Sequence, residues 1–224
     1  MSIVWYSERH DVAVIHIHKT GGLSLQAALV GAIPDLQTLA ELPHAHHRLE
    51  ELFGYLEARG KDPLATTVVA GVCHPAAHAV SIYEFWRSPK TDNEAHLGLV
   101  ALTRQLDFPD FLEKVLIRDQ FAESLLVDDE LPPNVHLVHR ERLAEETSAF
   151  LEGVMGHRVD VALPHLNRTR HGPVAGYFEE HDVLERLRRS YEWTFSQGLY
   201  RLDDLPSELP TSRWSRVLPG RLFR

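Results

Sequence analysis

One short stretch of the chain contains residues that could hold a phosphate or sulfate group. It reads VIHIHKTGGLSL and includes Lys19, Thr20, Gly21, Gly22 and Ser24. The glycines let the backbone approach an anion closely, and a helix that begins near Ser24 would add unpaired amides and the positive end of its dipole. Lys19 adds a mobile positive charge, and the two hydroxyls can donate hydrogen bonds. The stretch therefore predicts an anion site rather than a plain glycine turn with an exposed lysine.

The surrounding sequence predicts elements that would put this stretch between a strand and a helix. Apolar runs predict strands at residues 11–18, 65–72 and 134–140. Helical patterns cover residues 24–32, 47–59, 76–86, 108–121, 142–153 and 179–196. This alternation predicts an α/β fold with a doubly wound parallel sheet flanked by helices. Ligands bind beyond the carboxyl ends of such strands, so the segments HKTGGLS, CHPAAH and HRERL should converge.

Composition narrows the class of protein. The 224 residues have no evident linker or repeat, which predicts one domain, 1–224, with a basic tail from about residue 206. The formal net charge of −9 argues against nonspecific binding to nucleic acid. Cys73 is the single cysteine, so a cysteine-based zinc site has too few ligands. The sequence suggests neither a secretory leader nor a transmembrane segment, and we expect a cytoplasmic protein.

The stretch HIHKTGGLSL resembles the phosphosulfate-binding loop of sulfotransferases that use 3'-phosphoadenosine 5'-phosphosulfate (PAPS), particularly the group related to heparan sulfate 2-O-sulfotransferase and its bacterial relatives. That family's loop usually reads Pro-Lys-Thr-Gly-Gly-Thr-Ser, and His18 and Leu23 stand where the proline and the later threonine would be. Four further segments resemble the family in the same order, namely VVAGVCHPAAHAVSIYEF, HLVHRERL, LPHLNRTRH and LRRSYEWTFSQGLYRL. The resemblance implies a P-loop nucleotide-binding-like sulfotransferase fold. It also implies metal-independent transfer of a sulfuryl group from PAPS to a hydroxyl of a small-molecule or carbohydrate acceptor.

The resemblance assigns roles to individual residues. Lys19 would neutralise charge on the leaving phosphate oxygen, and Ser81 would contact the 3'-phosphate. The 5'-phosphate would be bound by Lys19, Thr20, Gly21, Gly22, Leu23 and Ser24. An acceptor hydroxyl also needs a general base, and histidine is the common choice. In LPHAHHRLEELF the resemblance favours His46 as that base, with His44 assisting.

The sequence departs from the family at the 3'-phosphate. Cys73 stands where the family has an arginine, His74 where it has Asn or Asp, and His78 where it has a second arginine. We expect Arg168 or Arg170 in LNRTRH to supply the missing charge, assisted by a protonated His78. Donor binding would then strengthen as the pH falls through the histidine range, and Cys73→Arg would tighten it.

Two other functions remain open from the sequence. The chain could be a degenerate homologue that binds a nucleotide without turnover. It could also be a metal-binding hydrolase or sensor, with His74 and His78 on one helix face and ligands from the histidines at 44, 46 and 47. The acidic balance favours a small-molecule or glycan acceptor over a polysulfated one, and a polar insert at residues 85–110 is expected to border the acceptor cleft. The sequence is also compatible with a homodimer.

Overall fold

A computed structural model describes residues 4–39, 42, 48–88, 97–161, 163 and 172–206. Its sheet has five strands in the order β3-β1-β2-β4-β5. They are β1 (Trp5–Ser7), β2 (Val12–Ile15), β3 (Gln37–Thr38), β4 (Thr67–Val72) and β5 (Val135–His139). Strands β2, β4 and β5 are parallel, whereas β1 is antiparallel to both β2 and β3. The predicted parallel sheet is thus correct for three strands and wrong for the edge that β1 and β3 form, so the sheet is mixed.

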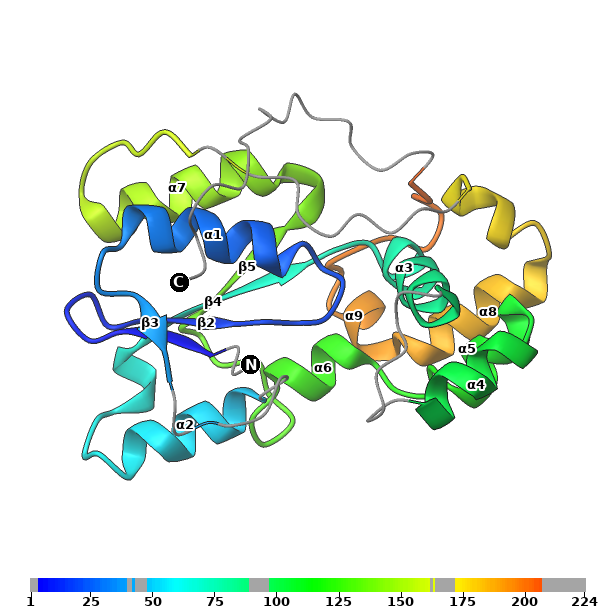
Figure 1. Ribbon diagram of the computed structural model, residues 1–224, viewed down its shortest axis with the longest axis horizontal. Coiled ribbons are helices and arrows are strands. Elements are labelled where there is room, and N and C mark those ends of the chain that lie inside the picture. The colour runs from blue at the N-terminus through cyan, green and yellow to red at the C-terminus, as the bar shows by residue number, and fades with distance from the viewer. Residues whose placement is uncertain are drawn as a thin grey trace.

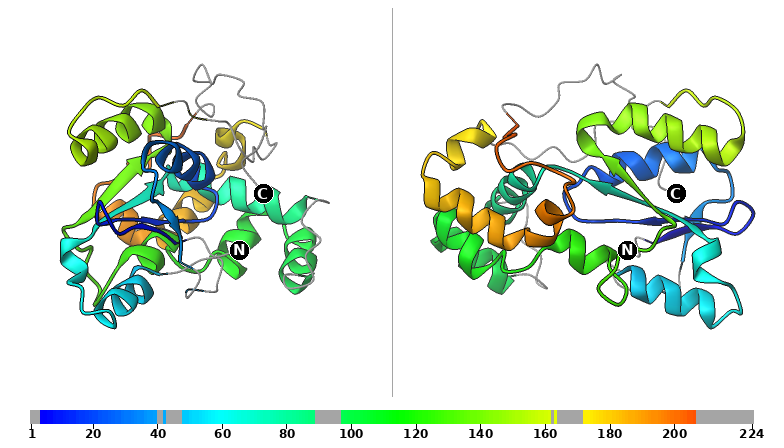
Figure 2. Two further views of the ribbon diagram at one scale, coloured as in Figure 1. Left: turned by 60° about the vertical axis from the view of Figure 1, so that its left-hand side comes forward. Right: turned by 180° about the vertical axis from the view of Figure 1, so that it is seen from behind.

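The helices form a layer on each face of the sheet and a group beyond one end of it (Figures 1 and 2). Helices α1 and α7 cover one face, and α2 and α6 lie on the other. Helices α3, α4, α5, α8 and α9 gather beyond the end at which β2 and β4 finish (Figure 1). The bounds are α1 (Gly22–Ala32), α2 (Leu49–Glu57), α3 (Pro75–Arg87), α4 (Leu97–Gln105), α5 (Phe108–Lys114), α6 (Gln120–Leu125), α7 (Leu143–Met155), α8 (His181–Ser190) and α9 (Glu192–Ser196).

Strand β2 illustrates how the core fixes the start of the loop. All four of its residues are buried. Val12 and Val14 pack in the cluster that contains the apolar residues of α1 and α7, whereas Ala13 and Ile15 pack in the cluster on the other face. Successive strand residues point to opposite faces, so a continuous apolar run is what a doubly covered strand requires. The loop after Ile15 therefore leaves a strand that is anchored on both sides.

Two predicted helices are divided in the structure, and one further helix lies where none was predicted. The helix expected at 108–121 is two helices, α5 and α6, and Asp119 begins the second by accepting hydrogen bonds from the amides of Phe121 and Ala122 at 3.0 and 3.2 Å. The helix expected at 179–196 breaks at Tyr191, whose φ and ψ are −127° and 38°. Helix α4 lies inside the segment expected to be a polar insert. None of the described helices is long and apolar enough to cross a membrane.

Candidate functional site

The loops that follow β2, β4 and β5 converge, as the sequence predicts. His78 on α3 lies 2.7 Å from the carbonyl oxygen of His18, and because a carbonyl can only accept, Nε2 of His78 carries the hydrogen. From the end of β5, Nη1 of Arg140 donates to the carbonyl oxygen of Lys19 at 3.2 Å. Residues 16–21, between β2 and α1, are called the lysine loop below. Two hydrogen bonds thus tie the lysine loop to the segments that follow β4 and β5.

The lysine loop has the backbone form of an anion cradle. Lys19 and Gly21 both have left-handed conformations, with φ of 64° and 86°. Glycine takes this form without penalty, whereas a lysine there costs roughly 1–2 kcal/mol, a type of strain often found at binding sites. The carbonyl of Gly21 accepts from the amides of Ser24 and Leu25 at 2.9 and 3.1 Å, and among the described residues no side chain caps α1. The first amides of the helix are therefore directed toward whatever occupies the loop.

Gly22 is fixed by a close neighbour, which gives a testable prediction. A Cβ atom at this position would lie 2.4 Å from Nδ1 of His16. We expect Gly22→Ala to destabilise the fold by about 1–3 kcal/mol through overpacking, measured by chemical denaturation. The control is Gly31→Ala in the same helix, where an added Cβ would meet nothing within 4 Å. Equal stability of the two variants would contradict the argument.

Thr20 stabilises the loop through a hydrogen bond within the loop itself. Its hydroxyl donates to the carbonyl oxygen of Ile17 at 2.9 Å, and its side chain is fully buried. This hydrogen is therefore used inside the protein, so the hydroxyl is not a free donor for an anion. Ser24, also predicted to bind the phosphate, is buried in the first turn of α1, and Leu23 beside it is half-buried.

Two cationic side chains meet at the loop. Burial, reinforced by the nearby charge of Arg140, lowers the pKa of Lys19 to about 8. The Nζ atom of Lys19 lies 4.7 Å from the centre of the Phe85 ring, a cation–π distance. Arg140 lies against Gly21, since a Cβ on that glycine would be 3.3 Å from Cγ of the arginine. Sequence reasoning missed Arg140, although a basic residue directly after the carboxyl end of a parallel strand could have identified it.

The segment after β4 carries no charge at the site. Cys73 is fully buried, and burial raises the pKa of its thiol to about 12, so the thiol is neutral. His74 caps α3, with Nδ1 accepting from the amide of Ala76 at 3.1 Å and Nε2 donating to the carbonyl of Arg201 at 3.0 Å. Burial lowers the pKa of His74, which agrees with this neutral form. Neither residue supplies the fixed positive charge that the family resemblance places here.

The expected role of a protonated His78 is wrong. The ring is fully buried, and burial lowers its pKa to about 3. Nδ1 accepts from the hydroxyl of Tyr191 at 2.6 Å, while Nε2 donates to the loop carbonyl of His18. His78 is therefore a neutral brace beneath the loop. Ser81, one turn further along α3, is buried as well.

Other predicted residues lie outside the described part of the chain, namely His44, His46, His47, Arg168, Arg170 and the basic tail from residue 207. Of the metal ligands considered from the sequence, His74 and His78 both use their two ring nitrogens in hydrogen bonds. Within the described ranges, no group of three or more His, Cys, Asp or Glu side chains could hold a metal ion.

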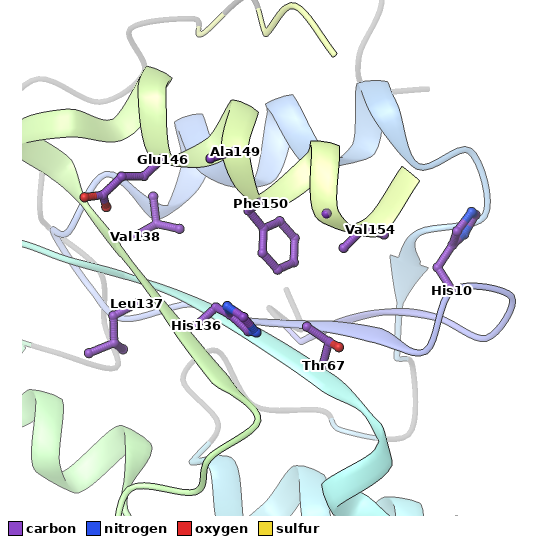
Figure 3. A pocket seen from close by; sticks show the side chains of 10 residues that line it. His10, Thr67, His136, Leu137, Val138, Glu146, Ala149, Phe150 and Val154 are labelled. Carbon is purple, nitrogen blue, oxygen red and sulfur yellow. The ribbon is translucent and has the colours of Figure 1, made fainter. Parts of the chain in front are cut away.

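A separate pocket of about 560 Å³ lies along β5 under α7 (Figure 3). It is lined by His10, Thr67, His136, Leu137, Val138, Glu146, Ala149, Phe150, Gly153 and Val154. The ring of Phe150 points toward His136, and their centroids are 5.7 Å apart. None of the residues predicted to bind the donor lines this pocket, so the lysine loop remains the candidate site.

No protein-family model matches the chain, and no curated protein or solved structure was found with significant similarity to it.

Proposed function

We propose that this protein is a PAPS-dependent sulfotransferase that acts on a hydroxyl of a small-molecule or carbohydrate acceptor. One observation carries the proposal: Lys19 adopts the left-handed conformation in a glycine turn between a buried parallel strand and a helix. That turn carries a desolvated lysine and leads directly into the first amides of α1. These are the groups that the resemblance of HIHKTGGLSL assigns to the phosphosulfate.

In the proposed reaction, the acceptor oxygen forms a bond to sulfur while the bond between sulfur and the 5'-phosphate oxygen breaks. Lys19 and the amides of Gly22 and Leu23 stabilise the negative charge that develops on this phosphate oxygen. His46, or His44 beside it, takes the proton of the acceptor hydroxyl. The products are a sulfate ester and 3'-phosphoadenosine 5'-phosphate (PAP).

Calorimetry with PAP tests the donor assignment before any acceptor is known. The proposal expects saturable binding with one site per chain, tighter than the binding of adenosine 5'-monophosphate (AMP), which lacks the 3'-phosphate. A protein that bound neither nucleotide would refute the donor assignment.

The pH dependence of this binding tests the role of Lys19. Its pKa is about 8 in the free protein, so the side chain is charged below that pH and neutral above it. PAP binding should therefore weaken as the pH rises from 7 to 9.5, by up to tenfold per pH unit above 8. Titrations of wild type and Lys19→Met at several pH values measure this dependence, and wild-type binding that is flat over this range would contradict it.

A second candidate is a degenerate homologue that binds a nucleotide but transfers nothing. Neutral Cys73 and neutral His78 favour it, because both occupy positions where the family has arginines. This candidate predicts PAP binding without PAP release from PAPS, whatever acceptor is supplied. A panel of phenols and neutral sugars with PAPS would separate the two candidates.

A further inference from the structure

Arg140 carries hydrogen-bond donors that the protein does not use. Its Nη1 atom donates to the carbonyl of Lys19, which fixes the plane of the guanidinium. The Nε and Nη2 atoms have almost no accessible surface, and among the described residues they have no hydrogen-bond partner. These two nitrogens form one edge of the guanidinium, the edge whose parallel hydrogens match two oxygens of a phosphate or sulfate.

In the described part of the chain, two carboxylates that closely follow Arg140 do not pair with this edge. Glu141 is adjacent in sequence, but its Oε1 accepts from the amide of His74 at 2.9 Å and its Oε2 accepts from the hydroxyl of Tyr200 at 3.1 Å. Glu146, one turn into α7, pairs with Arg142 at 2.6 Å and with His139 at 3.0 Å. Both carboxylates are thus engaged elsewhere.

An arginine kept for structure normally has its donors paired, because unsatisfied buried donors reduce stability. Here the unpaired edge belongs to a side chain that also lies against Gly21 and next to a second cation, Lys19. Two neighbouring cations at one glycine turn repel each other when the loop is empty. An anion between them would remove both the repulsion and the unsatisfied donors.

We propose that Arg140 is an anion-binding residue whose Nε and Nη2 atoms pair with the phosphate group seated on the lysine loop. The arginine after β5 thereby adds a fixed positive charge beside that of Lys19 at the loop. For a nucleotide ligand this group is the 5'-phosphate. The nucleotide class rests on the function proposed above, whereas the anion site does not.

The test compares Arg140→Met with wild type by calorimetry, using PAP, AMP and inorganic pyrophosphate. The substitution should weaken PAP and AMP binding by the same factor, about 10²-fold, because both nucleotides carry the 5'-phosphate. Arg140→Lys keeps the charge but lacks the planar fork, so its loss should be about tenfold. Arg142→Gln is the matched control. It removes the same charge two residues away and should bind as wild type does.

Thermal unfolding without ligand separates binding from a structural role. Without ligand, the cost of the unsatisfied Nε and Nη2 donors of Arg140 offsets its single hydrogen bond to the carbonyl of Lys19. Arg140→Met should therefore unfold at a temperature no lower than that of wild type while losing the stabilisation by PAP. Unchanged binding by Arg140→Met or Arg140→Lys would overturn the inference. So would a loss confined to the preference for PAP over AMP, which would put Arg140 at the 3'-phosphate, or a wild type that bound none of the three anions. Pyrophosphate binding that depends on Arg140, without nucleotide binding, would refute the donor but uphold the anion site.

Discussion

Replacing Lys19 by alanine is expected to lower the rate of sulfuryl transfer by roughly 10²-fold or more. In the proposed reaction the Nζ atom stabilises the charge that develops on the leaving phosphate oxygen, and its partial burial makes each electrostatic contact stronger than in water. The measurement is the initial rate of PAP release from PAPS with saturating acceptor.

Two variants separate loss of charge from damage to the loop. Lys19→Asn removes the amine but retains a residue that tolerates the left-handed conformation, so its rate should fall as far as that of the alanine variant. Lys114→Ala removes a surface lysine that pairs with Asp110 at 2.6 Å, and its rate should not change. A Lys19→Asn variant with wild-type activity would exclude the amine from the reaction.

Replacing Cys73 by arginine is expected to destabilise the protein by about 3–5 kcal/mol rather than to tighten donor binding. The sequence alone predicts tighter binding, because the family has arginine at this position. The structure leads to the opposite expectation, since Cys73 is fully buried and lies within electrostatic reach of Lys19 and Arg140. The carboxylate of Glu141 is also near, but its two oxygens already accept from the amide of His74 and the hydroxyl of Tyr200. A guanidinium there would be a third cation beside a carboxylate that is already engaged, in a space filled by a thiol.

For a chain of 224 residues this loss corresponds to a fall in Tm of about 10 °C. Differential scanning calorimetry measures it, with Cys73→Ala as the control that keeps the site small and neutral. If Cys73→Arg unfolded at the wild-type temperature and bound PAP more tightly, the sequence-based expectation would be right. The 3'-phosphate would then bind beside residue 73.

The parts of the fold that could be predicted are those with strong local patterns. The runs that became β2 and β4 are almost entirely apolar because both faces of the sheet are covered there, and the glycine turn is visible from residue types alone. Strands β1 and β3 have three and two residues, too few for any periodicity to appear. No local pattern in the sequence predicts the break at Tyr191. The hydroxyl of this tyrosine donates to the ring of His78, 113 residues earlier in the chain, and a local pattern does not record such a contact.

The site was predictable in its location but not in its charges. The sequence places Lys19, Cys73 and the segment containing Arg140 after consecutive parallel strands, and topology alone then brings them together. Whether a histidine is charged depends on burial, which a motif does not encode, and so the neutral state of His78 was missed. Arg140 was missed for a related reason: its partner is a carbonyl 121 residues away.

The brace from Tyr191 through His78 to the carbonyl of His18 also bears on when the site forms during folding. It joins parts of the chain separated by more than 170 residues, and contacts of such long sequence separation form late because the chain must first close a large loop. A growing chain that has not yet reached α8 can pair β2 with β4 but has no tyrosine to fix the His78 ring. The lysine loop should therefore be among the last parts of the molecule to become protected from hydrogen exchange during refolding, even though its residues are synthesised well before Tyr191.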